Sequence, residues 1–183
     1  WCGIGTSCAG WMMTPSELAD IYRGYIDCLN RPVWDDLGRY VGENAQHNGR
    51  FLGLSGYRDM LINDFEQIPD LRFNIDLLVC EPPHVAARLA FDCSPKGRFL
   101  GLDINGRRIR FSENVFYRFE AGRIVDVRSV LDKVAIEAQL ERSRRAFPFR
   151  GATPTRPKIS RGGQRCNVTF LPQVPGRKRG RRR

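Results

Sequence analysis

The chain has 183 residues, a length that allows one domain with a substantial hydrophobic core and is short for two. Its formal net charge of +10 suggests a nucleic-acid-binding protein, but residues 17–141 hold 16 Lys/Arg and all 20 Asp/Glu, whereas residues 142–183 hold 14 Lys/Arg and no acidic residue. The basic character therefore belongs to the C-terminal segment, and the rest of the chain is acidic.

The first predicted element is a helix that begins near residue 15. Residues 1–12 have no positively charged start and no apolar run long enough for a signal peptide or a membrane span, so we expect an unstructured leader. Thr14 or Ser16 can cap a helix whose first turn accepts Pro15 and Glu17. Apolar side chains then recur at the three- and four-residue spacing of a helix that packs on one side, namely Leu18, Ile21, Tyr22, Tyr25, Ile26 and Leu29.

Two further helices are predicted before residue 70. The first covers about 33–41, and the second covers about 57–67 and stops before Pro69. The second carries Tyr57, Leu61, Asp64 and Phe65 on related faces. Between these helices we predict a short strand at 46–48 and a turning loop with three glycines.

After Pro69 the hydrophobic period changes from helical to two, which predicts strands. The alternating segments cover about 71–79, 85–91, 109–119 and 124–132, and a last short helix is expected over 133–140. Helices followed by four long antiparallel strands indicate an α+β domain over 13–141, in which a curved antiparallel sheet wraps around three N-terminal helices and leaves a pocket. Residues 142–183 are rich in Pro, Gly and Arg without periodicity, and we expect a basic, disordered tail.

The six cysteines are scattered, with no CxxC and no paired His spacing, so a zinc site is not expected. A hairpin that turns at Pro82-Pro83 would place Cys80 opposite about residue 85 and far from Cys93. We therefore predict reduced thiols and a cytoplasmic location.

Asp132, in the segment IVDVRSVLD, is the first candidate for acid/base chemistry. A carboxylate at the mouth of an apolar cavity has a pKa raised toward neutral pH, which suits a general base. Asp132 is equally well placed to cap the helix that follows it. The residue pattern leaves both roles open.

Two charged residues on predicted strands also qualify as site residues. Glu113 is the one charge on an otherwise apolar strand face, so it is either a pocket carboxylate or the partner of Arg88 or Arg128 in an internal ion pair. Arg128, if it faces inward, would bind an anionic substrate group or an enolate; otherwise it pairs with Asp126 or Glu113.

The remaining candidates are uncharged or titrate near neutral pH. His47 is either a proton shuttle or a histidine with a purely structural hydrogen bond. Tyr25 lies on the inward stripe of the first helix, where it is either a phenol donor to a substrate oxygen or a core residue. We predict that Asn48 contacts the substrate and that Phe65 forms an apolar wall.

The order of several short segments resembles the SnoaL-like polyketide cyclases and ester cyclases, a family within the nuclear transport factor 2-like superfamily. The resemblance runs from about residue 17 to 141 and rests on HNG at 47–49, GYR at 56–58, PDLRF at 69–73, FEAGRIV at 119–125 and SVLD at 129–132. It implies a cone-shaped fold, a cofactor-free active site inside the cone, and a homo-oligomer that forms through the outer face of the sheet.

The resemblance also implies a reaction. Ring-closing members of the family use an acidic residue at the end of the last strand in an intramolecular aldol reaction on a hydrophobic carbonyl compound, and the matching residue is Asp132. Many relatives place Trp four residues before that acid, whereas this chain has Arg128. We accordingly predict an acid/base cyclase or isomerase. The alternatives are a ligand-binding domain without catalysis, and a nucleic-acid binder that acts through the tail with no sequence specificity.

Overall fold

The computed structural model describes residues 13–32 and 34–146. The predicted leader, 1–12, and the greater part of the predicted tail, 147–183, lie outside the described residues. Within the two described ranges, no helix is both long and apolar enough to cross a membrane.

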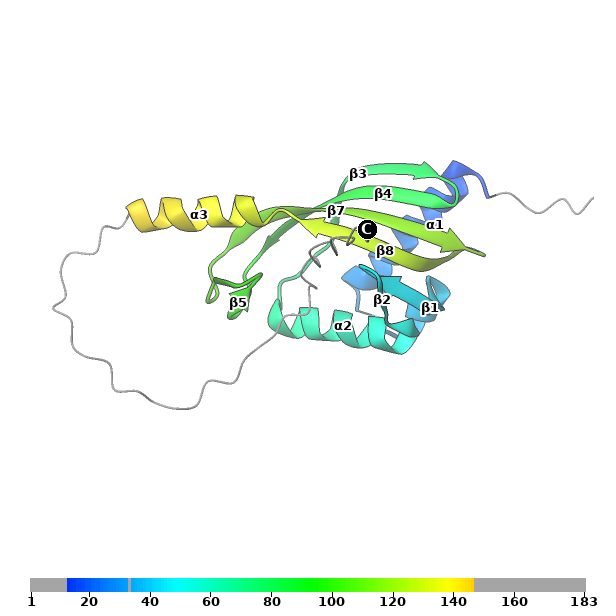
Figure 1. Ribbon diagram of the computed structural model, residues 1–183, viewed down its shortest axis with the longest axis horizontal. Helices are drawn as coiled ribbons and strands as arrows, with labels where there is room; N and C mark the ends of the chain where they lie inside the picture. The colour runs from blue at the N-terminus through cyan, green and yellow to red at the C-terminus, as the bar shows by residue number, and fades with distance from the viewer. Residues whose placement is uncertain (1–12, 33, 147–183) are drawn as a thin grey trace, which may run out of the picture.

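A six-stranded sheet forms the framework of the domain (Figure 1), with the strand order β2-β1-β8-β7-β4-β3. Its strands are β1 (Val41–His47), β2 (Arg50–Phe51), β3 (Asn74–Glu81), β4 (His84–Cys93), β7 (Ile109–Glu120) and β8 (Arg123–Leu131). A separate small hairpin, which the sequence pattern did not predict, consists of β5 (Arg98–Phe99) and β6 (Leu102–Asp103).

The four long strands pair as predicted. β3, β4, β7 and β8 are consecutive antiparallel neighbours, and Cys80 lies opposite Val85 across the β3–β4 turn. Cys80 and Cys93 are free thiols. The prediction of a purely antiparallel sheet is wrong, however, because β1 pairs with β8 in parallel. The domain therefore has a mixed sheet within an α+β fold.

The helices differ from the prediction in type and length. Two α-helices, α1 (Pro15–Asn30) and α2 (Gly53–Gln67), flank one 3-10 turn, η1 (Trp34–Arg39), so the three predicted N-terminal helices are two α-helices and one short 3-10 segment. The last helix, α3 (Lys133–Ala146), continues past the predicted domain end at residue 141. Figure 1 shows that α3 extends beyond the end of the sheet.

Local interactions fix α1 at both ends. The Thr14 hydroxyl accepts from the Glu17 N–H, and the Glu17 carboxylate accepts from the Thr14 N–H at 2.8 Å, so Thr14 is the cap. At the other end, the Asn30 amide donates to the Phe73 carbonyl and its oxygen accepts from the Phe73 N–H, at 2.9 and 2.8 Å. These contacts hold α1 against the start of β3.

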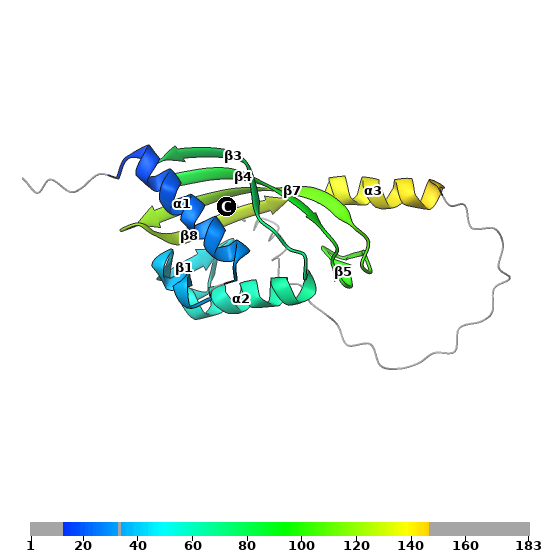
Figure 2. The ribbon, with the colours of Figure 1, turned by 180° about the vertical axis from the view of Figure 1, so that it is seen from behind.

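The sheet has one buried and one exposed face. On β7 the odd-numbered residues from 109 to 119 are buried. α1 lies across this side of the sheet (Figure 2), where Tyr117 packs against Tyr22 and Tyr25. The opposite, outer face carries exposed apolar side chains, namely Leu77, Val79, Phe116 and Val130. The inner face is where a site inside the cone would form.

Candidate functional site

A cluster of polar side chains lies inside the apolar core. His47 at the end of β1, Asp64 on α2, Glu113 on β7 and Ser129 on β8 are all between 3 and 6% exposed. None of the side chains that are buried in the described ranges is Lys or Arg. The two carboxyl groups therefore have no buried cation to stabilise their charged forms.

Burial changes the acidity of both carboxyl groups. It raises the pKa of Glu113 to about 7, and the nearby Ser129 hydroxyl offsets part of this shift. It raises the pKa of Asp64 to about 8, with a further upward contribution from the charge of Glu113 and a smaller downward one from Asn63. Near neutral pH, both groups can therefore take up or release a proton.

Four buried tyrosines, namely Tyr22, Tyr25, Tyr57 and Tyr117, interact electrostatically with Glu113. The Tyr25 and Tyr57 hydroxyls form a buried hydrogen bond of 2.8 Å. The ring of Tyr117 packs against those of Tyr22 and Tyr25, with centroids 5.1 and 6.0 Å apart. Burial raises the pKa of all four phenols above the ordinary value, so they remain neutral O–H donors at physiological pH.

His47 borders the same cluster. Its ring makes an edge-on contact with the ring of Tyr57, with centroids 6.4 Å apart. Burial lowers the pKa of His47, and the negative charge of Asp126 opposes this shift. The imidazole is thus mainly neutral at pH 7 and can accept a proton.

Several polar atoms of the cluster lack a well-aligned hydrogen bond within the described parts of the chain. They are the Tyr22 hydroxyl, His47 Nδ1, Asp64 Oδ1 and the Ser129 hydroxyl. Buried polar groups are almost always hydrogen-bonded, and exceptions concentrate at functional sites. A ligand with oxygen or nitrogen atoms would satisfy them.

Asn48 supports the cluster from the turn after β1. Its backbone has a positive φ of 48°, and its side-chain oxygen accepts from the Ser129 N–H at 2.9 Å. Its own N–H donates to the Val127 carbonyl at 2.8 Å. Asn48 therefore fixes β1 to β8 beside His47 and Ser129, which is a positioning role.

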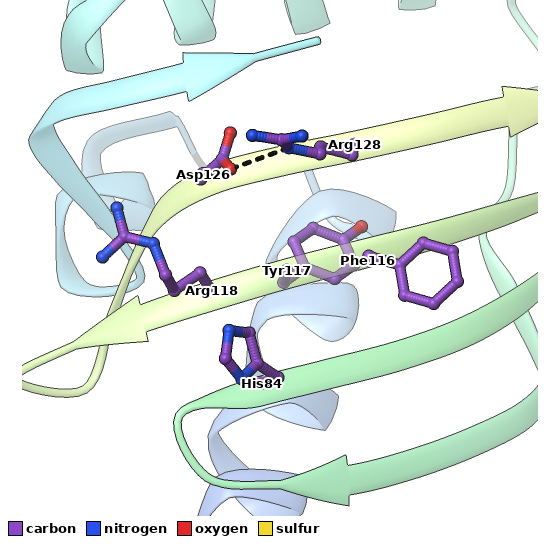
Figure 3. A pocket seen from close by; sticks show the side chains of 6 residues that line it. All are labelled: His84, Phe116, Tyr117, Arg118, Asp126 and Arg128. Carbon is purple, nitrogen blue, oxygen red and sulfur yellow. Dashed lines mark hydrogen bonds and ion pairs between the residues drawn. The ribbon is translucent and has the colours of Figure 1, made fainter. Parts of the chain in front are cut away.

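Arg128 and Arg88 have exposed side chains on the outer face of the sheet, and of the two roles left open for Arg128 the pairing with Asp126 is the one present. Arg128 has a 74% exposed side chain on the outer face and pairs with Asp126 at 3.1 Å, as Figure 3 shows. Arg88 pairs with Asp76 at 3.4 Å on the same face. Phe116, which lies opposite Arg128, is at one of the even-numbered positions of β7, and these point outward. Glu113 is at one of the odd-numbered positions, which point inward, so it lies on the other face of the sheet.

The outer face holds a separate shallow pocket of about 340 Å³. Figure 3 shows the residues that line it, namely His84, Phe116, Tyr117, Arg118, Asp126 and Arg128. Each arginine has an acidic neighbour on its own strand, since Arg118 pairs with Glu120 and Arg128 with Asp126. These pairs neutralise much of the positive charge.

The other two candidates are Asp132 and Phe65, and the Asp132 N–H donates to the Ser112 carbonyl at 2.8 Å, one residue before Glu113. Asp132 follows β8 and caps α3, where its Oδ1 accepts from the Ala135 N–H at 3.0 Å. Phe65 is half-buried and packs against Trp34 and Phe73, with ring centroids 5.5 and 6.2 Å away. The cap role left open for Asp132 is therefore present.

Sequence reasoning did not select Asp64, Tyr57 or Ser129 as site residues. A usable signal was the spacing 57, 61, 64 on α2, which puts one acid on a stripe with Tyr57 and Leu61. The apolar stripe of such a helix faces the core, so an acid on that stripe is expected to be buried. No comparable signal exists for Ser129, whose position depends on its pairing with Asn48 and on strand register.

Comparisons with known proteins agree with this fold. The family model for SnoaL-like polyketide cyclases matches residues 19–140. A comparison with curated proteins finds no match. Among solved structures, a SnoaL-like polyketide cyclase from Agrobacterium tumefaciens is 56% identical, with a TM-score of 0.68 over 70% of this chain and 99% of that one.

More distant structures share the fold. TsrD from Streptomyces laurentii is 20% identical, with a TM-score of 0.61 over 70% of this chain and 97% of that one. IdmH from Streptomyces antibioticus is also 20% identical, with a TM-score of 0.59 over 68% of this chain and 99% of that one. Because the family model covers most of the described domain and the bacterial cyclase shares more than half of its aligned residues, the chain belongs to the SnoaL-like polyketide cyclase family.

Proposed function

We propose that the protein is a cofactor-independent enzyme that uses Glu113 as a general acid/base on a hydrophobic substrate with a carbonyl group. The observation that carries the proposal is the position of Glu113, buried on the inner face of β7 with a pKa near 7 and no buried cation beside it in the described chain. Such a carboxyl group holds or releases a proton with little free-energy cost at neutral pH.

The reaction follows from these groups. The Glu113 carboxylate removes a proton from the carbon next to a carbonyl, and the C–H electron pair becomes a carbon–carbon double bond while the carbonyl oxygen gains negative charge. Neutral O–H donors such as Tyr57 stabilise that oxygen. The enolate carbon then attacks a second carbonyl of the same molecule, which closes a ring, and the oxygen of that carbonyl takes up the proton that Glu113 holds. Alternatively, Glu113 returns its proton to another carbon of the enolate, which isomerises the substrate.

The buried polar side chains favour a reaction that develops charge on a carbonyl oxygen over the binding of an anion. The buried polar side chains are acids, phenols, hydroxyls and one imidazole. Developing charge on a carbonyl oxygen is therefore stabilised by hydrogen bonds rather than by a guanidinium, in contrast to the role considered for Arg128.

Deuterium exchange tests the proposal. The full chain is incubated in D₂O with 2-acetylnaphthalene, an aryl methyl ketone, and loss of the methyl proton signal is followed by NMR. We expect acceleration by the natural chain and a fall of about 10² in Glu113→Gln, the usual scale for a positioned acid/base group. Glu66→Gln, an exposed acid on α2, is the matched control.

Exchange at the natural rate in Glu113→Gln would remove Glu113 from the mechanism. Tight binding of the ketone without any acceleration would instead favour the ligand-binding alternative.

We also propose that two copies associate through the outer sheet face. Phe116 on β7 and Leu77 on β3 are 60 and 58% exposed on this face, and large exposed apolar side chains on one face of a sheet mark interaction surfaces. The same face carries the pairs Arg88–Asp76 and Arg128–Asp126, so it presents both charge signs to an identical copy.

Sedimentation should show a dimer that Phe116→Glu dissociates and that Phe51→Glu, at the other edge of the sheet, leaves intact. A monomeric natural chain would contradict this proposal.

A further inference from the structure

The end of the domain that carries the β5–β6 hairpin is rich in arginine. Arg108, directly before β7, and Arg110, on β7, both donate to Asp92 on β4, through their Nε atoms at 2.6 and 2.9 Å. The two arginine side chains are exposed, and the carboxylate that they share is half-buried. A single negative charge therefore holds two guanidinium groups in place, and the three side chains together keep a net positive charge.

The base of the hairpin adds two more cations. The Gly106 N–H donates to the Pro95 carbonyl at 2.7 Å, and the residues that follow these two are Arg107 and Lys96. Both side chains are exposed, and neither forms an ion pair within the described chain. Because Arg107 directly precedes Arg108, the hairpin and the start of β7 present their charges at the same end of the molecule.

Hydrogen bonds fix α3 beside these arginines. The Gln139 Oε1 on α3 accepts from the Arg110 N–H at 2.9 Å, and the Gln139 Nε2 donates to the Arg110 carbonyl at 2.6 Å. Arg142 lies about one helical turn after Gln139, so the two side chains are neighbours on the helix surface, and Arg142 is exposed. Figures 1 and 2 show α3 and the β5–β6 hairpin at the same end of the sheet. These cations form one surface, the basic end, which consists of Lys96, Arg107, Arg108, Arg110 and Arg142.

The acidic residues around the basic end compensate only part of its charge. Asp103 and Glu137 each pair with a cation outside this surface, at 3.1 and 3.5 Å. Asp92, Asp70 and Glu141 are the other acidic residues of this region. When these three carboxylates are set against the cations of the basic end, the balance is still positive.

The chain continues this positive charge beyond the described residues. Residues 142–183 hold 14 Lys/Arg and no acidic residue, and this segment starts on α3, at the basic end. The two aromatic residues of the same end, Phe99 and Phe111, are buried. The described part of the basic end therefore offers cations but no exposed aromatic ring on which a base could stack.

We propose that the basic end binds the phosphate backbone of double-stranded nucleic acid without sequence selectivity, a function that is independent of the proposed enzyme activity. Arg108 and Arg110 use their Nε atoms on Asp92, so their terminal N–H groups can donate to phosphate oxygens. A duplex is favoured over a single strand because it has the higher density of phosphate charge, and because the binding of single strands depends on stacking.

Fluorescence anisotropy with a labelled DNA duplex of about 30 base pairs and mixed sequence tests the proposal. At about 0.1 M KCl the full chain should bind this duplex with a Kd of about 10⁻⁶–10⁻⁴ M, more tightly than a single strand of equal length. The affinity should fall steeply with added salt. Arg107→Gln/Arg142→Gln should weaken binding at least about fivefold and make the slope of log K against log[KCl] smaller by about 2, because two phosphate contacts are lost.

A matched double variant is the control for net charge. Arg50→Gln/Arg123→Gln removes the same charge from exposed arginines on β2 and at the start of β8, which lie away from the basic end. It should weaken binding less than about twofold, because salt screens charges at that separation.

A single variant at Asp92 should have the opposite effect. Asp92→Asn removes a negative charge from the basic end but keeps an oxygen acceptor for the two arginines, so it should tighten binding about two- to tenfold. Asp20→Asn, which removes the partner of Arg23 on α1, should leave the affinity unchanged. A gain in affinity cannot result from loss of the fold, so this measurement complements the losses.

The outcomes decide between surfaces and between ligands. Equal losses in the two double variants, or no gain in Asp92→Asn, would overturn the basic end as the binding surface. Tighter binding to the single strand would overturn duplex phosphates as its ligand, and tighter binding to phosphatidylserine vesicles would assign the surface to membranes instead. The ketone exchange assay should give the natural rate in all of these variants, so the proposed function stands or falls separately.

Discussion

The hydroxyl groups of Tyr25 and Tyr57 join α1 to α2 through a hydrogen bond of 2.8 Å between two side chains that are 1 and 2% exposed. Each hydroxyl is the other's partner, so removal of one leaves the second buried without it. Such an unsatisfied group costs more than the hydrogen bond itself contributes. The pair therefore couples the orientation of the two helices that cover the inner face.

A double-mutant cycle measures this coupling. Tyr57→Phe should lower the free energy of unfolding by about 1–3 kcal/mol, because it leaves the Tyr25 hydroxyl unpaired. The double variant Tyr25→Phe/Tyr57→Phe should lose less than the sum of the single changes. Urea unfolding gives the values. Tyr22→Phe is the control, because its hydroxyl has no well-aligned partner in the described structure; strict additivity of the first two changes would contradict the coupling.

Stability should depend on pH through the raised pKa of Glu113. The folded pKa of about 7 lies above the ordinary value of 4.5, so the stability that this group contributes is fully present below about pH 4.5 and is lost as pH rises through 7. Glu113→Gln does not titrate. Its free energy of unfolding, relative to the natural chain, should therefore increase between pH 5 and 8 by on the order of 3 kcal/mol, measured by urea unfolding. A pH-independent difference would place Glu113 in a solvated environment.

His47 should give the opposite trend. Burial lowers its pKa in the folded state, so its contribution to stability is present above about pH 6.5, the unperturbed value, and is lost as pH falls. His47→Gln should therefore gain stability relative to the natural chain on passing from pH 7 to 5, as thermal unfolding at a series of pH values can show. A relative loss in that range would mean that the folded protein favours the imidazolium.

Asn48 offers a test of how β1 is fixed to β8. Asn48→Ala removes the acceptor for the Ser129 N–H and puts Ala at a φ of 48°, so it should cost about 1–3 kcal/mol in urea unfolding. Asn105→Ala, at an exposed turn with a φ of 53°, reports the backbone cost alone. Equal losses in the two variants would show that the hydrogen bond contributes nothing.

The sequence pattern predicted the strands well where one face is clearly apolar. On β7, the alternation from Ile109 to Phe119 places Glu113 on the buried face, and the structure agrees. On β8, both faces carry apolar residues, since Ile124 and Val130 alternate with Val125 and Val127. A register shift near Phe119 makes the inward face of β8 harder still to identify. The alternation of residues along β8 therefore did not predict that Arg128 points outward.

Non-local pairing explains the other differences. β1 has the sequence VGENAQH, which lacks the alternation of a half-buried strand, and its parallel pairing with β8 depends on a partner about 80 residues away. Asp64 shared a face with Tyr57 in the predicted helix, but only the fold shows that its carboxyl group is buried, as that of Glu113 is. Local patterns predict elements, whereas a site depends on which elements meet.

The last prediction separates Asp132 from Glu113 as the proton-transfer group. Asp132 caps α3 through its Oδ1, and an Asn side chain retains an oxygen acceptor, so Asp132→Asn should leave the free energy of unfolding nearly unchanged. Asp132→Ala should lose about 1 kcal/mol. Because Asp132 is half-buried at the start of α3 and Glu113 is buried inside, we expect Asp132→Asn to retain most of the exchange activity that Glu113→Gln loses.

The family resemblance implies the reverse assignment, so the two variants must be compared in one assay. A loss of about 10² in Asp132→Asn, with natural stability and with full activity in Glu113→Gln, would move the acid/base role to Asp132. A loss in both would mean that the reaction needs the two carboxyl groups together. In that case the pH profile decides, because Glu113, with its pKa near 7, should set the acidic limb that disappears only in Glu113→Gln.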